Sequence, residues 1–413
     1  MILIKNADVY APEHLGIKDV LICGAQIEAV GEGLEGGSGC RIIDAEGKKL
    51  TPGLIDRHVH VTGGGGEGSF HTRTPQIQLS SVIRAGITTL VGLLGTDDVS
   101  RTPEDLIAKV KALKEEGISA YALCGAYGVP SPAITGSIKK DIAFIDEILG
   151  LKLAVSDHRA PNISTEELIR LASDVRTAGM ISGKCGCVVL HMGDGKKMLS
   201  QVFEALEETE IPVKTFQPTH VNRNHELFLD SLKLAKLGGT IDLTCEDFPH
   251  GLIEDGKDPV IGLLEEARRA GVPMERMTLS SDGQGSWSNY DEYGNLVEMG
   301  VTDVGNMYAQ LRSLVLNGGF VLSEALSFFT SNPAKALELF PKKGCIAPGA
   351  DADLLLMGEA LALDTVIARG RVMMEAGELL HVVADCHIYD RHIPVVKEMI
   401  KRKPYPAPIV KLN

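Results

Sequence analysis

The chain has 413 residues, of which 44% are hydrophobic and 23% charged, and its formal net charge is −14. These totals are typical of globular proteins, and the negative charge argues against nucleic acid or an anionic membrane as the main partner. No stretch approaches the roughly 18 apolar residues of a membrane span, and the N-terminal segment lacks a secretory signal pattern. Eight cysteines without a framework of paired spacings predict reduced thiols and a cytoplasmic protein.

Both ends of the chain are rich in short predicted strands. The N-terminal end includes "DVLICGAQIEAVGEG", with a hairpin turn at Gly24 and Ala25. The same pattern returns in "GCIAPGADADLLLM", in "DTVIARGRVMMEAGEL" and in "HVVAD". We expect residues 1–52 and 343–390 to form one small composite β-sandwich domain, followed by a C-terminal tail at 391–413.

Between these ends, residues 53–342 alternate short apolar strands with helical patterns. Examples are "GITTLVGLLG" followed by "PEDLIAKVKALKEEG", and "GCVVLHMGD" followed by "KMLSQVFEALEETE". The number of such units is about eight, which predicts a closed, TIM-like (β/α)8 barrel of the α/β class rather than an open doubly wound sheet. A further helix is expected over "LSEALSFFTSNPAKALEL".

Polar residues recur at the C-terminal ends of the predicted strands, the face on which barrel active sites lie. In chain order they are His58, His60, Lys152, His191, His220 and Asp282. His58 and His60 are two residues apart on a strand, so both face the barrel interior. Imidazoles that converge on one point suit zinc or a similar ion. Asp282 adds a carboxylate that can serve as a ligand and as a proton acceptor.

Lys152 is the unusual member of this set because it is a cation within an apolar strand. Burial favours its neutral amine, and a neutral amine can react with carbon dioxide to give a carbamate whose two oxygens can bridge two metals. Each candidate alone has an ordinary structural explanation, such as a hydrogen-bonded core histidine or a lysine that reaches solvent. Their occurrence together at strand ends favours a metal-dependent hydrolase.

The motifs around these residues resemble those of the amidohydrolase superfamily of metal-dependent barrel hydrolases. "PGLIDRHVH" is similar to its opening H-x-H strand and "SSDG" to its closing aspartate, and the likeness covers essentially the whole chain. Within the superfamily, "GGGGE", "SDHR" and "THVNRN" in this order resemble the isoaspartyl (β-aspartyl) dipeptidase family. The resemblance implies hydrolysis of the isopeptide bond of β-aspartyl dipeptides, which are small-molecule substrates. It also implies a homo-oligomer, since the family is commonly oligomeric and often octameric.

The resemblance further implies two zinc ions per subunit. Their histidine and aspartate ligands would be His58, His60 and Asp282 at the more buried ion, and His191 and His220 at the other. Carboxylated Lys152, which requires carbon dioxide or bicarbonate, would bridge the ions together with a hydroxide. By the same resemblance, Asp282 would take the proton of the attacking hydroxide and pass it to the leaving amine. Tyr127 would place its hydroxyl on the developing oxyanion.

For substrate recognition, the resemblance implies a second set of side chains. Glu67 is similar to the family glutamate that meets the substrate ammonium, and Arg159 and Arg223 are similar to guanidiniums that bind carboxylates. Thr96, Ser286 and Tyr127 correspond to family hydroxyls that contact the substrate. The four glycines before Glu67 lack the Lys-Ser/Thr ending of a nucleotide P-loop, so a phosphate-binding loop is excluded.

Two other functions stay open on the sequence alone. A cyclic-amide hydrolase of the dihydroorotase or hydantoinase type would share the metal ligands, but its substrate has no free ammonium to pair with Glu67. A non-catalytic scaffold that kept the barrel and lost the chemistry is the other alternative, although such chains usually lack several ligands and all six are present here. A site of histidine, carboxylate and carbamate also accepts divalent ions other than zinc.

Overall fold

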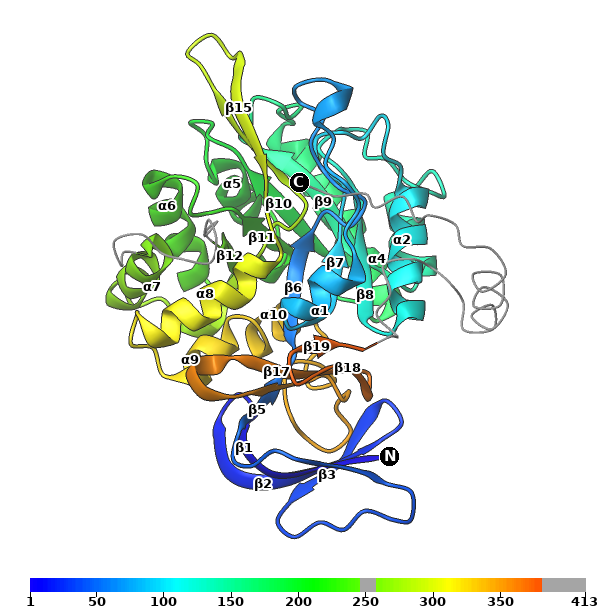
Figure 1. Cartoon of the computed structure of the whole chain (residues 1–413). Helices are drawn as coiled ribbons and strands as arrows, with labels where there is room; N and C mark the ends of the chain where they lie inside the picture. The colour runs from blue at the N-terminus through cyan, green and yellow to red at the C-terminus, as the bar shows by residue number, and fades with distance from the viewer. Residues whose placement is uncertain (246–257, 381–413) are drawn as a thin grey trace, which may run out of the picture.

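The computed structural model of the chain describes residues 1–245 and 258–380. Figure 1 shows a barrel surrounded by helices, with a smaller sheet below it that holds the N-terminal strands and the last described strands. Within the described residues, no helix is both long enough and apolar enough to cross a membrane.

Eight parallel strands form the barrel, in the order β13-β12-β11-β10-β9-β8-β7-β6. Their bounds are β6 Leu54–Val59, β7 Ile87–Gly92, β8 Ser119–Gly125, β9 Ile148–Val155, β10 Cys187–Met192, β11 Phe216–Thr219, β12 Ile241–Thr244 and β13 Met277–Ser280. All residues of β6, β7 and β9 are buried, as expected for parallel strands covered on both faces. The predicted (β/α)8 barrel is therefore confirmed.

The barrel closes where the end of β6 meets the segment after β13. Val59 bridges Gly283 in parallel register, and the His60 N–H donates to the Gly283 carbonyl at 2.9 Å. The buried carboxylate of Asp56 adds a side-chain link, because it accepts from the Ser281 backbone N–H at 3.2 Å and from the Ser281 hydroxyl. This seam sets the residues that follow β6 beside those that follow β13.

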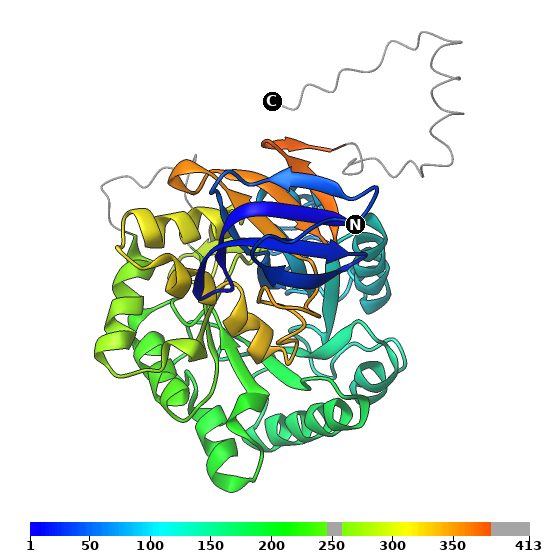
Figure 2. The same ribbon diagram turned by 90° about the horizontal axis from the view of Figure 1, so that it is seen from below.

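Helices lie around the barrel and appear as a ring in Figure 2. Their bounds are α1 Leu79–Arg84, α2 Pro103–Glu116, α3 Ile138–Phe144, α4 Thr165–Ser182, α5 Ser200–Glu208, α6 His225–Lys236, α7 Pro259–Arg269 and α8 Gly305–Leu316. Single 3-10 turns occur at η1 Phe70–Thr72, η2 Val213–Thr215, η5 Met274–Arg276 and η6 Glu359–Leu361. Local sequence explains several helix starts: Ser164 and Glu167 form a capping box before α4, and proline occupies the first position of α2 and α7.

The single helix expected over "LSEALSFFTSNPAKALEL" is wrong, because this stretch forms two short helices. These are α9 Leu322–Ser327 and α10 Ser331–Ala336. Pro333 lies in the first turn of α10, where its missing N–H is tolerated. In one continuous helix the same proline would remove an internal hydrogen bond and clash with the preceding turn.

An antiparallel hairpin, β14 Ser286–Tyr290 and β15 Leu296–Val301, is a feature that the sequence patterns did not indicate. It follows β13 and precedes α8 in the chain. In Figure 1 it extends beyond the barrel on the side opposite the smaller sheet. The hairpin therefore stands at the C-terminal mouth of the barrel.

Strands from both ends of the chain form one nine-stranded sheet, in the order β19-β18-β17-β16-β5-β1-β2-β3, with β4 paired to β1. Their bounds are β1 Ile2–Tyr10, β2 His14–Cys23, β3 Gln26–Gly31, β4 Arg41–Asp44, β5 Lys49–Pro52, β16 Leu354–Met357, β17 Leu363–Ala368, β18 Arg371–Glu375 and β19 Glu378–Leu379. The predicted turn at Gly24 and Ala25 joins β2 to β3. Ile4, Ile22, Leu354 and Ile367 belong to one apolar cluster, which confirms a small β domain composed from both chain ends.

The residue limits of the two domains, 1–52 with 343–390 and 53–342, stay a prediction. The barrel and the nine-stranded sheet are the two architectural units to which these limits refer. The strand predicted in "HVVAD", the rest of 381–390, and the tail at 391–413 lie outside the described residues.

Candidate active site

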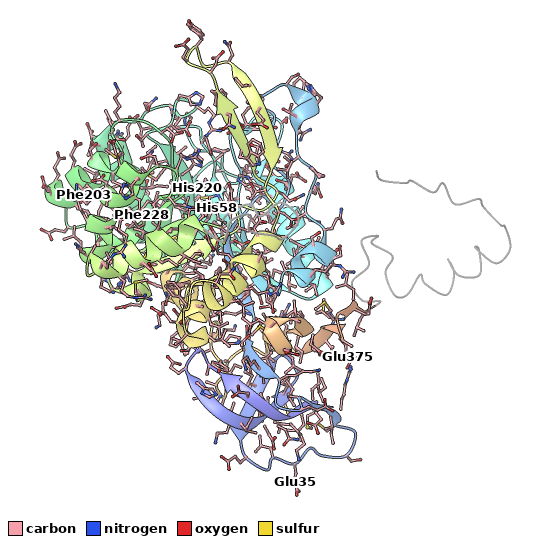
Figure 3. All side chains as sticks on the ribbon, turned by 60° about the vertical axis from the view of Figure 1, so that its left-hand side comes forward. Glu35, His58, Phe203, His220, Phe228 and Glu375 are labelled. Atoms are coloured by element: carbon pink, nitrogen blue, oxygen red, sulfur yellow. The ribbon has the colours of Figure 1, made fainter. Side chains whose placement is uncertain are left out.

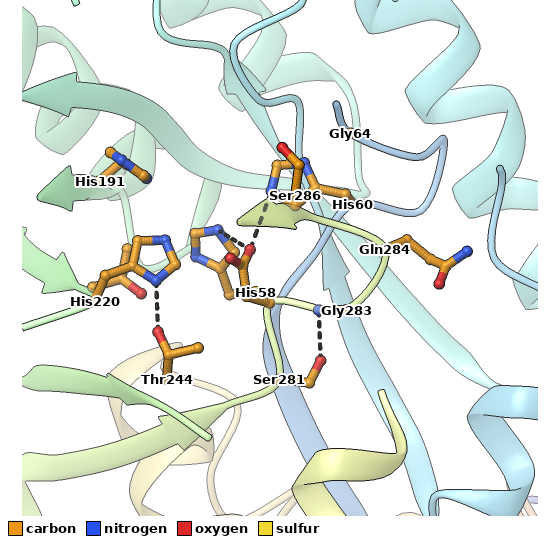
Figure 4. Close-up of polar contacts among 12 residues, drawn as sticks. His58, His60, Gly64, His191, His220, Thr244, Ser281, Gly283, Gln284 and Ser286 are labelled. Carbon is orange, nitrogen blue, oxygen red and sulfur yellow. Dashed lines mark hydrogen bonds and ion pairs between the residues drawn. The ribbon is translucent and has the colours of Figure 1, made fainter. Parts of the chain in front are cut away.

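The six predicted ligands gather at the C-terminal ends of the barrel strands, as Figures 3 and 4 show for the histidines. Lys152 lies on β9 and His191 on β10, whereas the others lie at or just beyond the ends of their strands: His58 and His60 at β6, His220 after β11 and Asp282 after β13. Lys152 is fully buried, and the four histidines are only 1–7% exposed. The structure thus brings together residues that are up to 224 positions apart in the chain, from His58 to Asp282.

Two of these residues have an uncommon backbone conformation. The φ angle is 61° at His220 and 53° at Asp282, in the left-handed region that non-glycine residues rarely adopt. Such conformations persist only where the surrounding structure holds them, and they occur often at functional sites. Their presence at both positions favours a functional role for these side chains.

Asp282 is at the centre of the contacts among the candidate ligands from β6 and β9. Its Oδ1 lies 3.4 Å from His58 Nε2 and 3.2 Å from His60 Nε2, and these two contacts are dashed in Figure 4. His58 Nε2 also lies 2.9 Å from Lys152 Nζ. One carboxylate, two imidazoles and one amine therefore share a small buried volume.

His220 and His191 form the other side of this volume. The His220 ring lies edge-on to the rings of His58 and His191, with centroid separations of 4.7 Å in both cases. Its Nδ1 lies 2.6 Å from the Thr244 hydroxyl, so this contact does not occupy Nε2, the other ring nitrogen. The imidazoles from three strands consequently converge.

Three imidazole nitrogens in this cluster, His58 Nδ1, His60 Nδ1 and His220 Nε2, are buried and have no hydrogen-bond partner. A buried polar atom without a partner costs about 1–3 kcal/mol, so it needs an explanation. One donor atom from each of His58, His220 and Asp282 lies within 4.8 Å of the other two. Imidazole nitrogen and carboxylate oxygen are ligands that zinc takes, so this donor set fits a bound divalent metal.

The charge states of the cluster also suit a metal. Burial lowers the pKa of His58, His191 and His220 well below the ordinary value, so these imidazoles are neutral and offer lone pairs. Burial lowers the pKa of Lys152 to about 7, although Asp282 and Asp242 oppose the shift. For Asp282, burial raises the pKa, but His220, His60 and Lys152 outweigh it and hold the pKa at about 2.

Tyr127 and Asp157 both contact His191. The Tyr127 hydroxyl lies 2.7 Å from His191 Nδ1, and Asp157 Oδ2 lies 3.0 Å from His191 Nε2. Burial raises the pKa of Tyr127, so its hydroxyl keeps its proton at neutral pH and can donate it in a hydrogen bond. Asp157 was not singled out from the sequence, although it is the aspartate of "SDHR". A carboxylate beside a metal-binding histidine commonly fixes the orientation of the ring.

Glu67 is surrounded by three of the residues predicted to bind substrate. Its carboxylate accepts from the Thr96 hydroxyl at 3.1 Å and from the Ser286 hydroxyl at 3.1 and 3.2 Å. It also forms an ion pair with Arg159, with 3.4 Å between Oε1 and Nη1. Arg159 is held in turn by two hydrogen bonds to the Asp157 carboxylate, at 3.0 and 2.8 Å. Side chains from three other segments of the chain thus meet at one carboxylate.

A cavity of about 500 Å³ opens above the cluster. All of the residues predicted for substrate binding line it, together with His60, His191, His220 and Asp282. Arg223 differs from Arg159, because it is exposed and its Nε donates to the Met192 carbonyl at 2.9 Å. No ion pair joins Arg223 to a carboxylate of the described residues. The cavity therefore contains one guanidinium that is already paired and one that is available to an anion.

Comparison with known proteins agrees with this geometry. The model of the amidohydrolase family matches residues 50–373. A crystal structure of β-aspartyl dipeptidase from the thermophilic, keratin-degrading Fervidobacterium islandicum AW-1, in complex with β-Asp-Leu, is 43% identical. That match covers 92% of this chain and 98% of the other, with a TM-score of 0.86.

Other matches point to relatives with different names. The dihydroorotase of Lactobacillus johnsonii is 26% identical over 387 residues, which cover 86% of this chain and 88% of the relative. A D-hydantoinase structure shares the fold, with 19% sequence identity and a TM-score of 0.64. That match covers 92% of this chain and 96% of the D-hydantoinase chain. The thymidylate synthase model matches residues 358–413, a stretch that lies largely outside the described residues.

Proposed function

This chain belongs to the amidohydrolase family, and from that premise we propose that it is a metal-dependent dipeptidase that cleaves the isopeptide bond of β-aspartyl dipeptides. The observation that carries the proposal is the ion pair between Glu67 and Arg159, which lines the same cavity as the histidine cluster. We further expect a cytoplasmic homo-oligomer that acts on small-molecule substrates.

The paired charges suit the free end of a β-aspartyl group. In a β-aspartyl dipeptide the peptide bond uses the side-chain carboxyl, so the α-ammonium and the α-carboxylate stay free on one carbon. Glu67 and Arg159 are 3.4 Å apart, so one can receive the ammonium while the other receives the adjacent carboxylate. An α-aspartyl dipeptide offers no such pair, because its α-carboxyl is part of the amide bond.

Arg223 extends the match to the rest of the substrate. A β-aspartyl dipeptide carries two free carboxylates, one on the aspartyl group and one on the residue that follows. The cavity has two guanidiniums, Arg159 and Arg223, and arginine is suited to carboxylates because its planar fork forms two parallel hydrogen bonds. The numbers of fixed cations and of substrate anions therefore agree.

The metal ligands that we propose are His58, His60, Lys152 as a carbamate, His191, His220 and Asp282. Two zinc ions at this site would supply Lewis acidity, which lowers the pKa of a bound water and polarises the scissile carbonyl. Asp282, ionised because its pKa is held at about 2, would take the proton of the attacking water and deliver it to the leaving amine. The protonated hydroxyl of Tyr127 can donate to the oxyanion that forms on the carbonyl.

A dihydroorotase activity is the second candidate, and the names of several relatives at 25–28% identity favour it. It would use the same metal ligands, so they do not separate the two functions. Glu67 does, because dihydroorotate has a carboxylate for an arginine but no ammonium for a glutamate. The higher identity of 43% belongs to a β-aspartyl dipeptidase, and it favours the dipeptidase.

The experiment that tests the proposal is a substrate panel with the purified, zinc-loaded protein. The panel contrasts β-Asp-Leu, α-Asp-Leu, a γ-glutamyl dipeptide and dihydroorotate. We expect β-Asp-Leu to be hydrolysed far faster than the other three. If no β-aspartyl dipeptide is turned over with zinc and bicarbonate present, the proposal is wrong, and turnover of dihydroorotate would identify the second candidate.

Glu67→Gln provides a test of substrate recognition. Loss of a charge-assisted hydrogen bond costs about 1.5–3 kcal/mol, so kcat/KM for β-Asp-Leu should fall about 10- to 100-fold. Steady-state kinetics measures this effect. Glu292→Gln, a change at an exposed glutamate of the hairpin tip, is the matched control and should leave kcat/KM unchanged. An unchanged kcat/KM in Glu67→Gln would remove the main support for an ammonium-bearing substrate.

Metal removal distinguishes an enzyme from a non-catalytic scaffold. Dialysis against a chelator should abolish hydrolysis of β-Asp-Leu, and added zinc should restore it, because the nucleophile depends on the metal. Elemental analysis of the purified protein should give about two metal ions per chain, as in two-metal hydrolytic sites. A content below about one ion per chain, with no gain of activity on adding zinc, would favour the scaffold.

A further inference from the structure

Arg101 is a buried cation that lies outside the cavity and donates hydrogen bonds to the loop that carries Glu67. It stands between β7 and α2 and is 5% exposed. Its Nη1 donates to the Thr62 carbonyl, and its Nη2 donates to the carbonyls of Gly64 at 2.9 Å and Thr74 at 3.0 Å. One guanidinium thus ties together both ends of the loop 62–74.

Inside the loop, the hydroxyls of Thr74 and Thr72 accept from the backbone N–H groups of Gly64 and Gly68, and the glycines pack closely against the opposite backbone. Gly63 and Gly65 have φ angles of +82° and +74°, and a Cβ on either would lie 2.2 Å from the Thr74 carbonyl oxygen or 2.4 Å from the Thr72 carbonyl oxygen, respectively. The two halves of the loop, around Gly63–Gly65 and around Thr72–Thr74, are therefore packed backbone to backbone, where only glycine fits. The Gly64 carbonyl also accepts from the Thr74 N–H at 2.9 Å, and Arg101 adds a donor for the buried carbonyls of Thr62 and Thr74.

The same backbone is connected to the active site on two sides. The Gly63 N–H donates to the His60 carbonyl at 2.7 Å, and the Gly64 N–H donates to the Gln284 carbonyl at 2.9 Å. Figure 4 shows Gly64 and Gln284 on the same side of His60. Gly64 also lines the cavity. A shift of this loop would therefore displace the cavity wall from which Glu67 projects.

We propose that Arg101 is a positioning residue that sets the place of Glu67 and, through it, the preference of the site for a ligand with an ammonium group. This inference rests on the proposed function, since it assigns Glu67 to the substrate ammonium. Arg101 does not line the cavity, so it acts through the loop rather than by contact with a substrate. Its planar fork reaches three carbonyls at once, which the single ammonium of a lysine does not reproduce.

The chain offers a matched control in Arg73. Both arginines lie near the Asp97 carboxylate, with 3.8 Å from Arg101 Nε and 3.6 Å from Arg73 Nε to Oδ2. The Arg73 side chain is 39% exposed, however, whereas that of Arg101 is 5% exposed. Arg73→Ala therefore removes a neighbouring charge of the same kind without removing the three bonds to the loop carbonyls.

Hydrogen–deuterium exchange of peptides covering residues 62–74 tests the structural step, whatever the substrate is. Arg101→Ala should speed exchange of these amides by about tenfold or more, because local opening of the loop becomes easier. Arg101→Lys should give an intermediate rate, and Arg73→Ala, compared at the amides of residues 62–72, should match the unmodified protein. If exchange in this loop is unchanged in both Arg101 variants, the inference is overturned.

Binding of L-aspartate and succinate to the zinc-loaded protein tests the functional step, because the two differ only in the ammonium group. Calorimetry on the unmodified protein should show tighter binding of L-aspartate, and Arg101→Ala should reduce that preference about tenfold while metal content stays constant. A merely structural role would weaken both ligands equally, and that result would refute the inference. Failure of the proposed function would appear separately, as an absence of β-aspartyl hydrolysis in the unmodified protein.

Discussion

Replacement of Asp282 by asparagine will lower kcat for β-Asp-Leu by about 10³-fold or more. The carboxylate is ionised at neutral pH, since its pKa is held at about 2, and it lies 3.2–3.4 Å from two of the proposed metal ligands. Asparagine keeps the shape of the side chain but neither the charge nor the ability to accept and return a proton. Steady-state kinetics of the zinc-loaded variant, with circular dichroism to confirm the fold, measures the effect.

Asp303→Asn is the control for this prediction. Asp303 lies in the same connection between β13 and α8, is exposed, and accepts from the Gly305 backbone N–H at 2.8 Å. Its replacement should change kcat less than about twofold, because an exposed carboxylate outside the cavity takes no part in proton transfer. If Asp282→Asn keeps more than about a tenth of kcat, another group carries the proton.

The barrel was predictable because the spacing of apolar residues within a short stretch indicates each strand and each helix. The period of apolar residues changes from strand to helix eight times, and a parallel barrel buries its strands on both faces, so the signal is strong. The hairpin β14–β15 gives no such signal. "SWSNY" is only half-buried or exposed along its length, so its sequence has no continuous apolar face. It is defined instead by pairing with Leu296–Val301.

The positions of the six candidate ligands were predictable for a related reason, because the ends of parallel strands meet on one face of a barrel. What escaped prediction are contacts between loops that are remote in sequence. Asp157, which follows β9, contacts His191 on the neighbouring strand β10, and Arg101 binds carbonyls of the 62–74 loop, which carry no side-chain signature. The ion pair of Arg159 with Glu67 is a further contact of this kind, while the binding of a substrate carboxylate by Arg159 stays a prediction. The sequence does not show these pairings.

Replacement of Lys152 by methionine will reduce β-Asp-Leu turnover by about 10³-fold and lower the metal content, because the proposed carbamate supplies ligand oxygens that a thioether lacks. The fold should persist. Lys152 is fully buried, and burial disfavours its charged form, with a pKa of about 7, so an apolar side chain of similar length is accommodated. Kinetics, elemental analysis and thermal unfolding of the metal-free protein measure these three outcomes.

Lys152→Ala then separates a carbamate from a simple amine at this position. The smaller side chain leaves space for an added molecule beside His58, which lies 2.9 Å from Lys152 Nζ in the unmodified chain. A short carboxylic acid such as propionate offers two oxygens like those of a carbamate, and it should restore turnover by about tenfold or more. Propylamine, which resembles the uncarboxylated lysine, should not. Rescue by the amine alone would show that Lys152 acts as an amine, and the assignment of a carbamate would then be wrong.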